Sequence, residues 1–491
     1  MVNNRKQTIF LSIILFTIII LFLGIPYTKW GFKTDDFGNI YHCFIKTYKD
    51  VLRFFYEGSI EVLSHPSNSA KEQGFFCGLY RPMSFIYYLP QVYFFKTNAY
   101  GYFFITIILH AINSVILFNI FLKIIPIIFA FLAAAYFAFH PSLHNWIGWI
   151  SAQTYFSELL VLLILILFLK KYLNTKKIKY YLISCFLLVA NLFLKEATVI
   201  FALWSIPATY FYKKITKNNQ ISSWENIKNS ILISIPYWII TAFYLTVRAI
   251  VLPITSNTGT LNFKFNWPSF IARMKDRFFD FVSYISDILG LNWIPPQTQI
   301  FKGILIILLI SFLIFLFIKN KKKSYILFLI FSVLIFSWPA LLIQYQPRYI
   351  YMSLTFFILM IIISFKFFKQ IKIFYKFKNV IIIILISLIT FNTIFLMKEL
   401  KKREKIRAHI TTSFNELIKN NTLLDAINNK TSLYFFNLPK QFSEGTAQAL
   451  WMLTKNSTYN VYQYGKPNNK NEKILSITWD YKLSKFKILK N

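Results

Sequence analysis

The chain has 491 residues, of which 56% are hydrophobic and 15% are charged, a composition too apolar for a water-soluble protein of this length. The 54 lysines and arginines exceed the 19 acids and give a formal net charge of +35, but most lysines lie in short groups between apolar runs, as in membrane proteins, so no nucleic-acid partner is expected. The 3 cysteines exclude a disulfide scaffold and a cysteine-based zinc cluster.

The apolar runs of roughly 17 to 25 residues match the length needed to cross a bilayer, and they are too long for the strands of an outer-membrane barrel. We therefore predict an all-α polytopic membrane protein with about eleven transmembrane helices. No small-residue cleavage site follows the first run, so we expect a retained helix rather than a signal peptide. The predicted spans are 8–25, 100–122, 124–139, 153–172, 179–194, 197–212, 230–252, 300–318, 324–343, 349–365 and 379–397.

The distribution of lysine between the links predicts the orientation in the membrane. Basic residues are concentrated in every second link, around residues 123, 170–179, 213–217, 319–323 and 366–378, and such links stay on the cytoplasmic side. The N-terminus is then inside and the C-terminus outside. The abundance of Lys, Asn, Ile and Phe favours a bacterial source, and hence the inner (cytoplasmic) membrane.

The first outer loop, residues 26–99, begins with the adjacent carboxylates Asp35 and Asp36 at the membrane boundary. Two adjacent acids in a low-dielectric setting raise each other's pKa, which suits a general base or a metal ligand, although a solvated helix cap is the simpler interpretation. An amphipathic stretch follows at 44–63 and predicts an interfacial helix. Cys43 and Cys77 share this loop, and a disulfide between them is an open alternative.

The same loop ends with Tyr80 and Arg81, followed by the aromatic run 85–95. An arginine at this depth is either an interfacial anchor or a partner for a phosphate.

Two histidines lie in or beside predicted spans. His110 stands inside the second span with Asn113 one helical turn away, where a hydrogen-bonded packing histidine is the simpler interpretation and a binding residue the alternative. His140 precedes Pro141 at the end of the third span. A helix stop at the proline and an aromatic belt at the membrane surface account for most of this segment without a catalytic role.

Two further sites carry charge on the predicted outer face. Lys195 and Glu196 interrupt an apolar stretch and form either a tight charged link or a binding site for a polar ligand. Arg348, which is followed by Tyr351, is either a snorkelling anchor or a phosphate ligand, because the guanidinium fork suits phosphate.

The remaining extramembrane parts are a second large outer loop at 253–299 and a C-terminal tail at 398–491. The tail is rich in Lys, Asn, Ser and Thr and contains short apolar stretches such as 432–436 that predict strands. We therefore divide the chain into a transmembrane domain, 1–397, and a small extracytoplasmic α/β domain, 398–491. The sequence has no phosphate-binding glycine loop, no HExxH and no CxxC.

The order and spacing of these motifs resemble those of the polytopic GT-C glycosyltransferases, most closely the transmembrane O-mannosyltransferase branch that carries TPR repeats, with its bacterial relatives. The similar segments are Asp35–Phe37, Tyr80–Ser84, Asn98–Tyr102 with Leu109–Asn113, Phe137–Pro141 with Trp149–Ser151, Leu194–Glu196 and Pro347–Tyr351. The chain departs from that branch at Leu143 and Asn145, where the branch has His and Glu, and in lacking the TPR array. A protein acceptor therefore does not follow from the resemblance.

The resemblance implies a membrane enzyme that transfers a sugar from a polyprenyl-phosphate donor to an extracytoplasmic acceptor, such as a glycolipid, a polysaccharide or a protein, with inversion. Asp35 would be the general base, with Asp36 assisting. No cofactor is certain, and a magnesium or manganese ion bridging Asp35 and Asp36 remains an open alternative. The substrate-binding residues would be Tyr80, Arg81, His110, His140, Lys195, Glu196, Arg348 and Tyr351. The alternatives are an O-antigen polymerase or ligase and a transporter or flippase for lipid-linked sugars.

Overall fold

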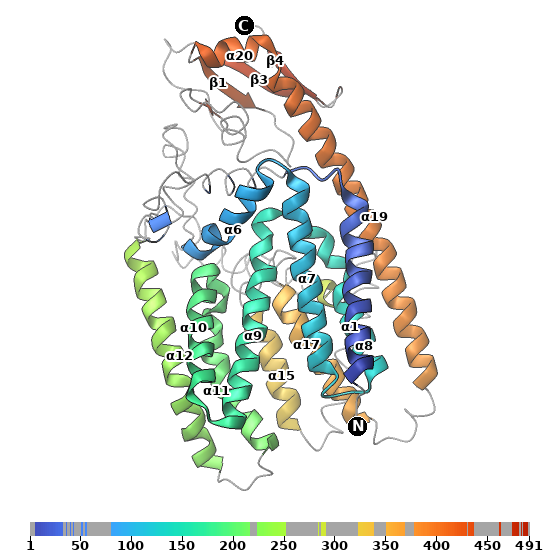
Figure 1. The fold of residues 1–491 in the computed structure, drawn as a ribbon, viewed down its shortest axis with the longest axis vertical. Coiled ribbons are helices and arrows are strands. Elements are labelled where there is room, and N and C mark those ends of the chain that lie inside the picture. The colour runs from blue at the N-terminus through green and yellow to red at the C-terminus, as the bar shows by residue number, and fades with distance from the viewer. Residues whose placement is uncertain are drawn as a thin grey trace, which may run out of the picture.

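The computed structural model describes residues 5–32, 80–216, 223–251, 286–290, 323–337, 350–368, 378–429, 431–436, 461–462, 474–480 and 485–489, together with residues 36, 40, 43, 51–52, 55, 283 and 483. The described part is mostly helical. Its helices lie side by side along the long axis of the molecule, and a small sheet stands beyond one end of the bundle (Figure 1).

The bundle contains helices at every predicted span except 300–318, which lies outside the described residues. Its helices are α1 (Arg5–Ile19), α7 (Ala99–Phe121), α8 (Ile127–Ala138), α9 (Gln153–Thr175), α10 (Ile178–Leu194), α11 (Ile200–Thr216), α12 (Ser223–Val251), α15 (Lys323–Phe336), α17 (Ile350–Phe368) and α19 (Lys378–Ile418). In the described residues, 6 helical segments are long and apolar enough to cross a membrane. Helices suit this role because each satisfies its backbone hydrogen bonds internally.

The ends of these helices follow local sequence signals. The Asn98 side chain caps α7 by accepting the backbone N–H of Tyr100 at 3.1 Å. Lys176 ends α9 in the left-handed conformation, with φ 57°, which lets the chain reverse directly into α10. Pro141 follows α8 and opens the short 3₁₀ helix η3 (Pro141–Asn145), because proline supplies no N–H to continue the helix before it.

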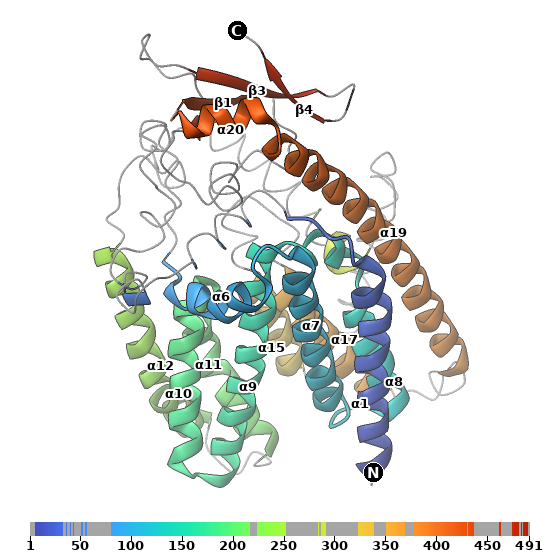
Figure 2. The same ribbon diagram turned by 45° about the horizontal axis from the view of Figure 1, so that its top comes forward.

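Helix α6 (Pro82–Phe95) lies across the end of the bundle that faces the sheet (Figure 2). It begins with Pro82, which favours the first turn of a helix. Tyr93 and Phe94 on this helix are 77% and 74% exposed, as expected for aromatic side chains at a membrane surface. The interfacial helix predicted at 44–63 lies largely outside the described residues.

Helix α19 is longer than the span predicted at 379–397, because it continues without a break to Ile418. The boundary proposed between residues 397 and 398 therefore falls inside a helix. The sequence beyond 397 is rich in Lys, Glu and Arg and contains neither glycine nor proline until Pro439. These charged residues are strong helix formers, so the helix does not end where the apolar segment ends.

The tail beyond α19 forms helix α20 (Asn421–Asn428) and strands β1 (Ser432–Phe436), β2 (Val461–Tyr462), β3 (Ile474–Asp480) and β4 (Lys485–Leu489). The strand order is β2-β1-β3-β4, with β1 parallel to both neighbours and β3 antiparallel to β4. The strand predicted at 432–436 is confirmed by β1. The sheet packs on the end of α19, where Phe414 contacts Phe486 edge to face at 5.4 Å between ring centroids.

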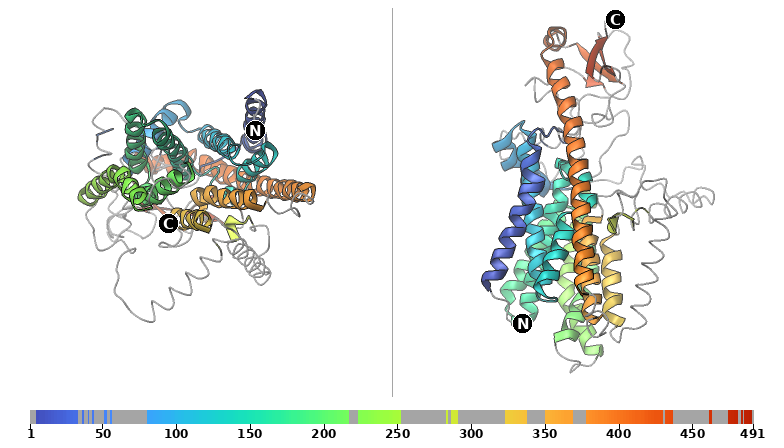
Figure 3. Two further views of the ribbon diagram at one scale, coloured as in Figure 1. Left: turned by 90° about the horizontal axis from the view of Figure 1, so that it is seen from below. Right: turned by 90° about the vertical axis from the view of Figure 1, so that its right-hand side faces the viewer.

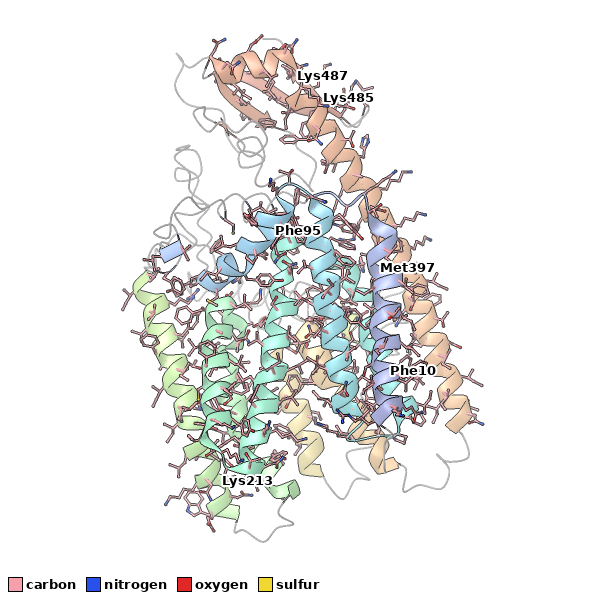
Figure 4. All side chains as sticks on the ribbon, in the orientation of Figure 1. Phe10, Phe95, Lys213, Met397, Lys485 and Lys487 are labelled. Carbon is pink, nitrogen blue, oxygen red and sulfur yellow. The ribbon has the colours of Figure 1, made fainter. Side chains whose placement is uncertain are left out.

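The two chain ends lie at opposite ends of the molecule (Figure 3). Figure 4 places Lys213 at the end of the bundle away from the sheet, and Lys485 and Lys487 on the sheet. Lys213 and the sheet thus mark opposite ends of the described part of the molecule, and α6 lies at the sheet end.

Candidate functional site

The link between α10 and α11 lies at the end of the bundle that carries α6. Lys195 leaves α10 with an extended backbone, φ −160° and ψ 129°, and Glu196 opens the 3₁₀ helix η5 (Glu196–Val199). This sharp turn keeps both charged residues close to the ends of two apolar helices. Lys195 is 2% exposed, and its ammonium lies 3.2 Å from the centroid of the Tyr155 ring, which stabilises the buried cation.

Arg81, at the start of α6, forms a two-pronged ion pair with Glu196. Its Nε donates to Oε2 at 2.6 Å and its Nη2 to Oε1, and the two side chains are 20% and 26% exposed. Burial by itself would raise the pKa of Glu196, but the charge and hydrogen bonds of Arg81 outweigh burial and lower that pKa to about 2. Burial would lower the pKa of Arg81, and Glu196 raises it. Both groups are therefore charged at neutral pH.

Asp36 is completely buried at the same end of the molecule. Its Oδ1 accepts the backbone N–H of Ile150 at 2.8 Å and that of Ser151 at 3.3 Å. The Tyr88 hydroxyl of α6 donates to the Ile150 carbonyl at 2.7 Å and lies within electrostatic range of both Asp36 and Arg81. Asp36 thus holds the turn η4 (Ile150–Ala152) that leads into α9, and Tyr88 ties this turn to α6.

Glu158 is a site residue that the sequence analysis missed. It lies on α9, fully buried, and its Oε1 accepts the Thr198 hydroxyl at 2.9 Å. Its Oε2 has no hydrogen-bond partner among the described residues, and Lys195, Glu196 and Arg81 all lie within electrostatic range. An isolated acid within the apolar span 153–172 was the signal that could have identified it, because acids within membrane spans are costly and usually functional.

Arg81, Glu158, Lys195 and Glu196 therefore form one cluster of ionisable side chains, built from the start of α6, α9 and the α10–α11 link. It combines the half-buried Arg81–Glu196 ion pair with a buried lysine and a buried carboxyl group. We call these four residues the outer cluster.

Tyr80 fixes the position of Arg81 through packing and backbone contacts. It is 1% exposed, and its hydroxyl donates to the Phe55 carbonyl at 2.8 Å. The Tyr244 hydroxyl of α12 donates to the Tyr80 carbonyl at 3.2 Å. The start of α6 is thus anchored to α12.

His110 and Tyr351, both predicted substrate-binding residues, lie in the core of the bundle. His110 Nδ1 lies 2.8 Å from the Tyr351 hydroxyl, and its Nε2 lies 3.0 Å from the Ala138 carbonyl. The Asn113 amide donates to the same hydroxyl at 3.3 Å and to the Phe156 carbonyl at 2.9 Å. All of these side chains are buried, which matches the interpretation of His110 as a packing histidine.

His140 is also fully buried, with its ring edge-on to Tyr136 at 5.4 Å between centroids. Its ring faces the Ile288 backbone, but neither ring nitrogen reaches hydrogen-bonding geometry with a described residue. The structure therefore places His140 beside the described part of the second large loop.

Asp35 and Arg348 lie outside the described residues. Within the described residues, no group of three or more His, Cys, Asp or Glu side chains is arranged to hold a metal ion. Cys43 is a buried free thiol that contacts the Phe85 carbonyl at 3.6 Å, and Cys77 is outside the described residues. The structure thus brings Arg81, Lys195 and Glu196 together and places Asp36 next to them through Tyr88.

The chain was also compared with known proteins. Neither a scan against protein-family models nor a search of curated proteins found a match.

Proposed function

We propose that this protein is a membrane glycosyltransferase of the GT-C type, which moves a sugar from a polyprenyl-phosphate donor to an extracytoplasmic acceptor with inversion. The observation that carries the proposal is the outer cluster, which gathers Arg81 and Lys195 at one end of an apolar bundle. Cations at this depth are costly to bury, and they suit a lipid-linked phosphate, whose charge lies at the same boundary while its chain lies in lipid.

The proposed orientation places the outer cluster and the sheet outside the cytoplasm, with the N-terminus inside and about eleven spans in a bacterial inner membrane. Two observations support it. The sheet and α6 share one end of the molecule, and Lys213, from one of the lysine-rich links, lies at the other (Figure 4).

In the proposed reaction, Asp35 removes the proton from the acceptor hydroxyl, and that oxygen attacks the anomeric carbon of the donor sugar. The bond from the anomeric carbon to the phosphate oxygen breaks, and the lipid phosphate leaves with the electron pair. Arg81, Lys195 and Arg348 stabilise the negative charge of the leaving phosphate. A phosphate that reaches Arg81 competes with Glu196 for the guanidinium, so Glu196 holds the arginine in place until the donor binds. Asp36 acts through the backbone that it fixes.

A divalent metal remains an open part of the proposal. The residues that would hold magnesium or manganese are Asp35 and Asp36, because carboxylate oxygens suit these ions. The buried Asp36 carboxylate accepts two backbone N–H groups through Oδ1, so a metal there would compete with protein contacts for this residue.

The proposal is tested first with purified protein in proteoliposomes and a panel of polyprenyl-phosphate sugars. Consumption of one donor with release of the lipid phosphate supports transfer. Movement of a donor between leaflets without consumption contradicts it and favours the transporter, whereas consumption of lipid diphosphate donors alone favours the polymerase or ligase.

The variant Asp35→Asn tests the proposed base. We expect loss of transfer by a factor of about 10² to 10⁴, the usual contribution of a general base, with unchanged membrane insertion. Asp50→Asn, in the same predicted loop, is the matched control and should retain activity. Wild-type turnover by Asp35→Asn would exclude Asp35 as the base.

The variant Arg348→Ala tests the proposed phosphate contacts. Removing one charge-assisted contact should raise the KM for the donor about tenfold and leave the KM for the acceptor unchanged. Arg348→Lys should restore part of the loss, because it keeps the charge but not the fork. An equal effect on both substrates would speak against a role in donor binding.

A further inference from the structure

The outward side of α19 changes abruptly from apolar to basic. Residues at steps of three or four share one stripe of a helix. The apolar part of this stripe consists of the exposed residues Val380, Ile384, Phe391 and Ile394. The same stripe then continues with Lys398, Lys402 and Lys405, flanked by Lys401, and all four lysines are exposed. We call these four lysines the lysine face.

The nearby acids of α19 lie on other sides of the helix and have contacts of their own. Glu399 lies within electrostatic range of Arg403 and His144. Glu404 accepts the backbone N–H of Lys29 at 2.9 Å. Within the part of the chain that the structure describes, the lysine face forms no ion pair and no hydrogen bond from its ammonium groups. It therefore presents four positive charges to the surroundings of the protein.

The length of the apolar segment places the lysine face at the membrane surface. At about 1.5 Å per residue, the segment 379–397 is roughly 28 Å long, which matches a hydrocarbon core of about 30 Å. From Lys398 to Lys405 the helix rises by roughly 10 Å. The headgroup layer is about 5 to 8 Å thick on each side, and flexible lysine side chains reach along the helix toward it.

The chain beside α19 changes from apolar to charged at the same level. Ile25 in the short helix η2 (Ile25–Tyr27) is exposed, and so is Lys29 four residues further. The Tyr27 hydroxyl between them donates to the Met397 carbonyl at 3.2 Å, which aligns this segment with the end of the apolar part of α19. Two elements distant in the sequence therefore place the boundary between hydrocarbon and headgroups at one depth.

The lysine face is confined to about two helical turns. Beyond Lys405 the stripe continues with His409 and Thr412 and then reaches the acid Glu416. An extended soluble polyanion would gain most from a basic track that continued to the sheet. A layer of lipid headgroups, by contrast, occupies only the depth at which these lysines lie.

We infer that the lysine face binds the headgroups of anionic phospholipids in the leaflet at the sheet end of the bundle. The phosphates lie at the level of Lys398 to Lys405, and the acyl chains cover Phe391 and Ile394 below them. Each lysine near the surface of an anionic membrane adds to this attraction. The contact resists movement of α19 along its axis. This inference does not depend on the proposed transferase activity.

The test measures which lipid lies beside the lysine face of the full-length protein. Ile394→Cys, one turn below Lys398, is labelled with bimane in a background in which Cys43, Cys77 and Cys185 are serine. The protein is reconstituted in mixed vesicles of phosphatidylglycerol and phosphatidylcholine. Bromine on the acyl chains of one lipid at a time quenches the label where that lipid is adjacent, and this gives the relative binding constant of the two lipids.

We expect phosphatidylglycerol to be preferred at this position by at least about tenfold. Lys398→Gln/Lys402→Gln/Lys405→Gln should reduce the preference to about twofold or less. The matched control is Lys419→Gln/Lys485→Gln/Lys487→Gln, which removes the same charge from exposed positions well beyond the headgroup layer. The control should stay within about twofold of the wild type.

Equal binding of the two lipids by the wild type would overturn the inference, and so would equal losses in the two triple variants. A third arm adds micromolar inorganic polyphosphate to an unchanged lipid mixture. Loss of the phosphatidylglycerol preference in this arm would identify the lysine face as a site for soluble polyanions and would also overturn the inference. If the triple variant does not insert, Lys402→Gln alone should lower the preference about threefold, and an unchanged preference would count against the inference.

Discussion

Arg81 and Glu196 lie 115 residues apart in the sequence, yet they form the ion pair that joins α6 to the α10–α11 link. Because Arg81 lowers the pKa of Glu196 from 4.5 to about 2, the folded state favours the carboxylate more than the unfolded chain does. The stabilisation is therefore complete above about pH 4.5 and is lost as the pH falls through about 2.

We predict that Glu196→Gln lowers the free energy of unfolding by about 1–3 kcal/mol at pH 7, since it leaves the Arg81 charge without its partner. The deficit should shrink as the pH falls below 4.5. Thermal unfolding in detergent, followed by tryptophan fluorescence across pH 3–7, measures this difference. The exposed Glu416 on α19 provides the control, and Glu416→Gln should change the free energy of unfolding little. A loss of unfolding free energy that does not change with pH would show that the Arg81–Glu196 ion pair is not its cause.

At this scale the sequence predicted the candidate residues better than their contacts. Lys195 and Glu196 were recognised because charges interrupting an apolar stretch are conspicuous. Arg81 was also a candidate, but its ion pair with Glu196 and the contact of Lys195 with Tyr155 were not predicted, because no local pattern encodes which helix ends meet. Glu158 was not among the candidates, because a single acid hardly changes the mean hydropathy of a long apolar run.

At the scale of elements, the turn between α8 and α9 depends on a glycine. Gly148 has φ +88°, and a side chain on it would overlap the ring of Trp30. The Trp30 indole N–H donates to the Gly148 carbonyl at 2.8 Å, and Arg407 of α19 bonds to the same carbonyl and lies over the indole, 4.9 Å from its centroid. The turn that Asp36 holds is thus also fixed by α19.

We predict that Gly148→Ala lowers the free energy of unfolding by about 2–4 kcal/mol, because the left-handed backbone disfavours alanine and the new methyl group displaces Trp30. Thermal unfolding in detergent gives the measurement. Gly24→Ala is the matched control: Gly24 has no positive φ, and its nearest neighbour would be 3.2 Å from the new carbon. Equal losses for the two variants would show that Gly148 has no special role.

The sequence predicted the positions of the bundle helices in the described residues, because long apolar runs leave the backbone few alternatives in lipid. It did not predict where α19 ends. Periodicity and hydropathy detect the change from apolar to charged residues. The end of a helix depends instead on the helix propensity of the residues, which stays high beyond residue 397.

For the whole molecule, the orientation can be tested directly. We predict that Lys485→Cys on β4 reacts with a membrane-impermeant maleimide added outside intact cells, whereas Lys177→Cys at the start of α10 reacts only after permeabilisation. Both are made in a background in which Cys43, Cys77 and Cys185 are serine. Labelling of both positions from the same side would exclude the proposed topology and, with it, the outer location of the cluster.

The continuous helix α19 also determines how far the C-terminal sheet lies from the membrane. Its 41 residues, at about 1.5 Å each, span roughly 60 Å, whereas the hydrocarbon core is about 30 Å thick. If α19 crosses the bilayer once, about half of its length therefore lies beyond the acyl chains. Because a continuous helix has no hinge, the sheet at its end stays at a fixed distance from the lipid. A molecule that binds the sheet would have to extend over this distance to contact the bundle.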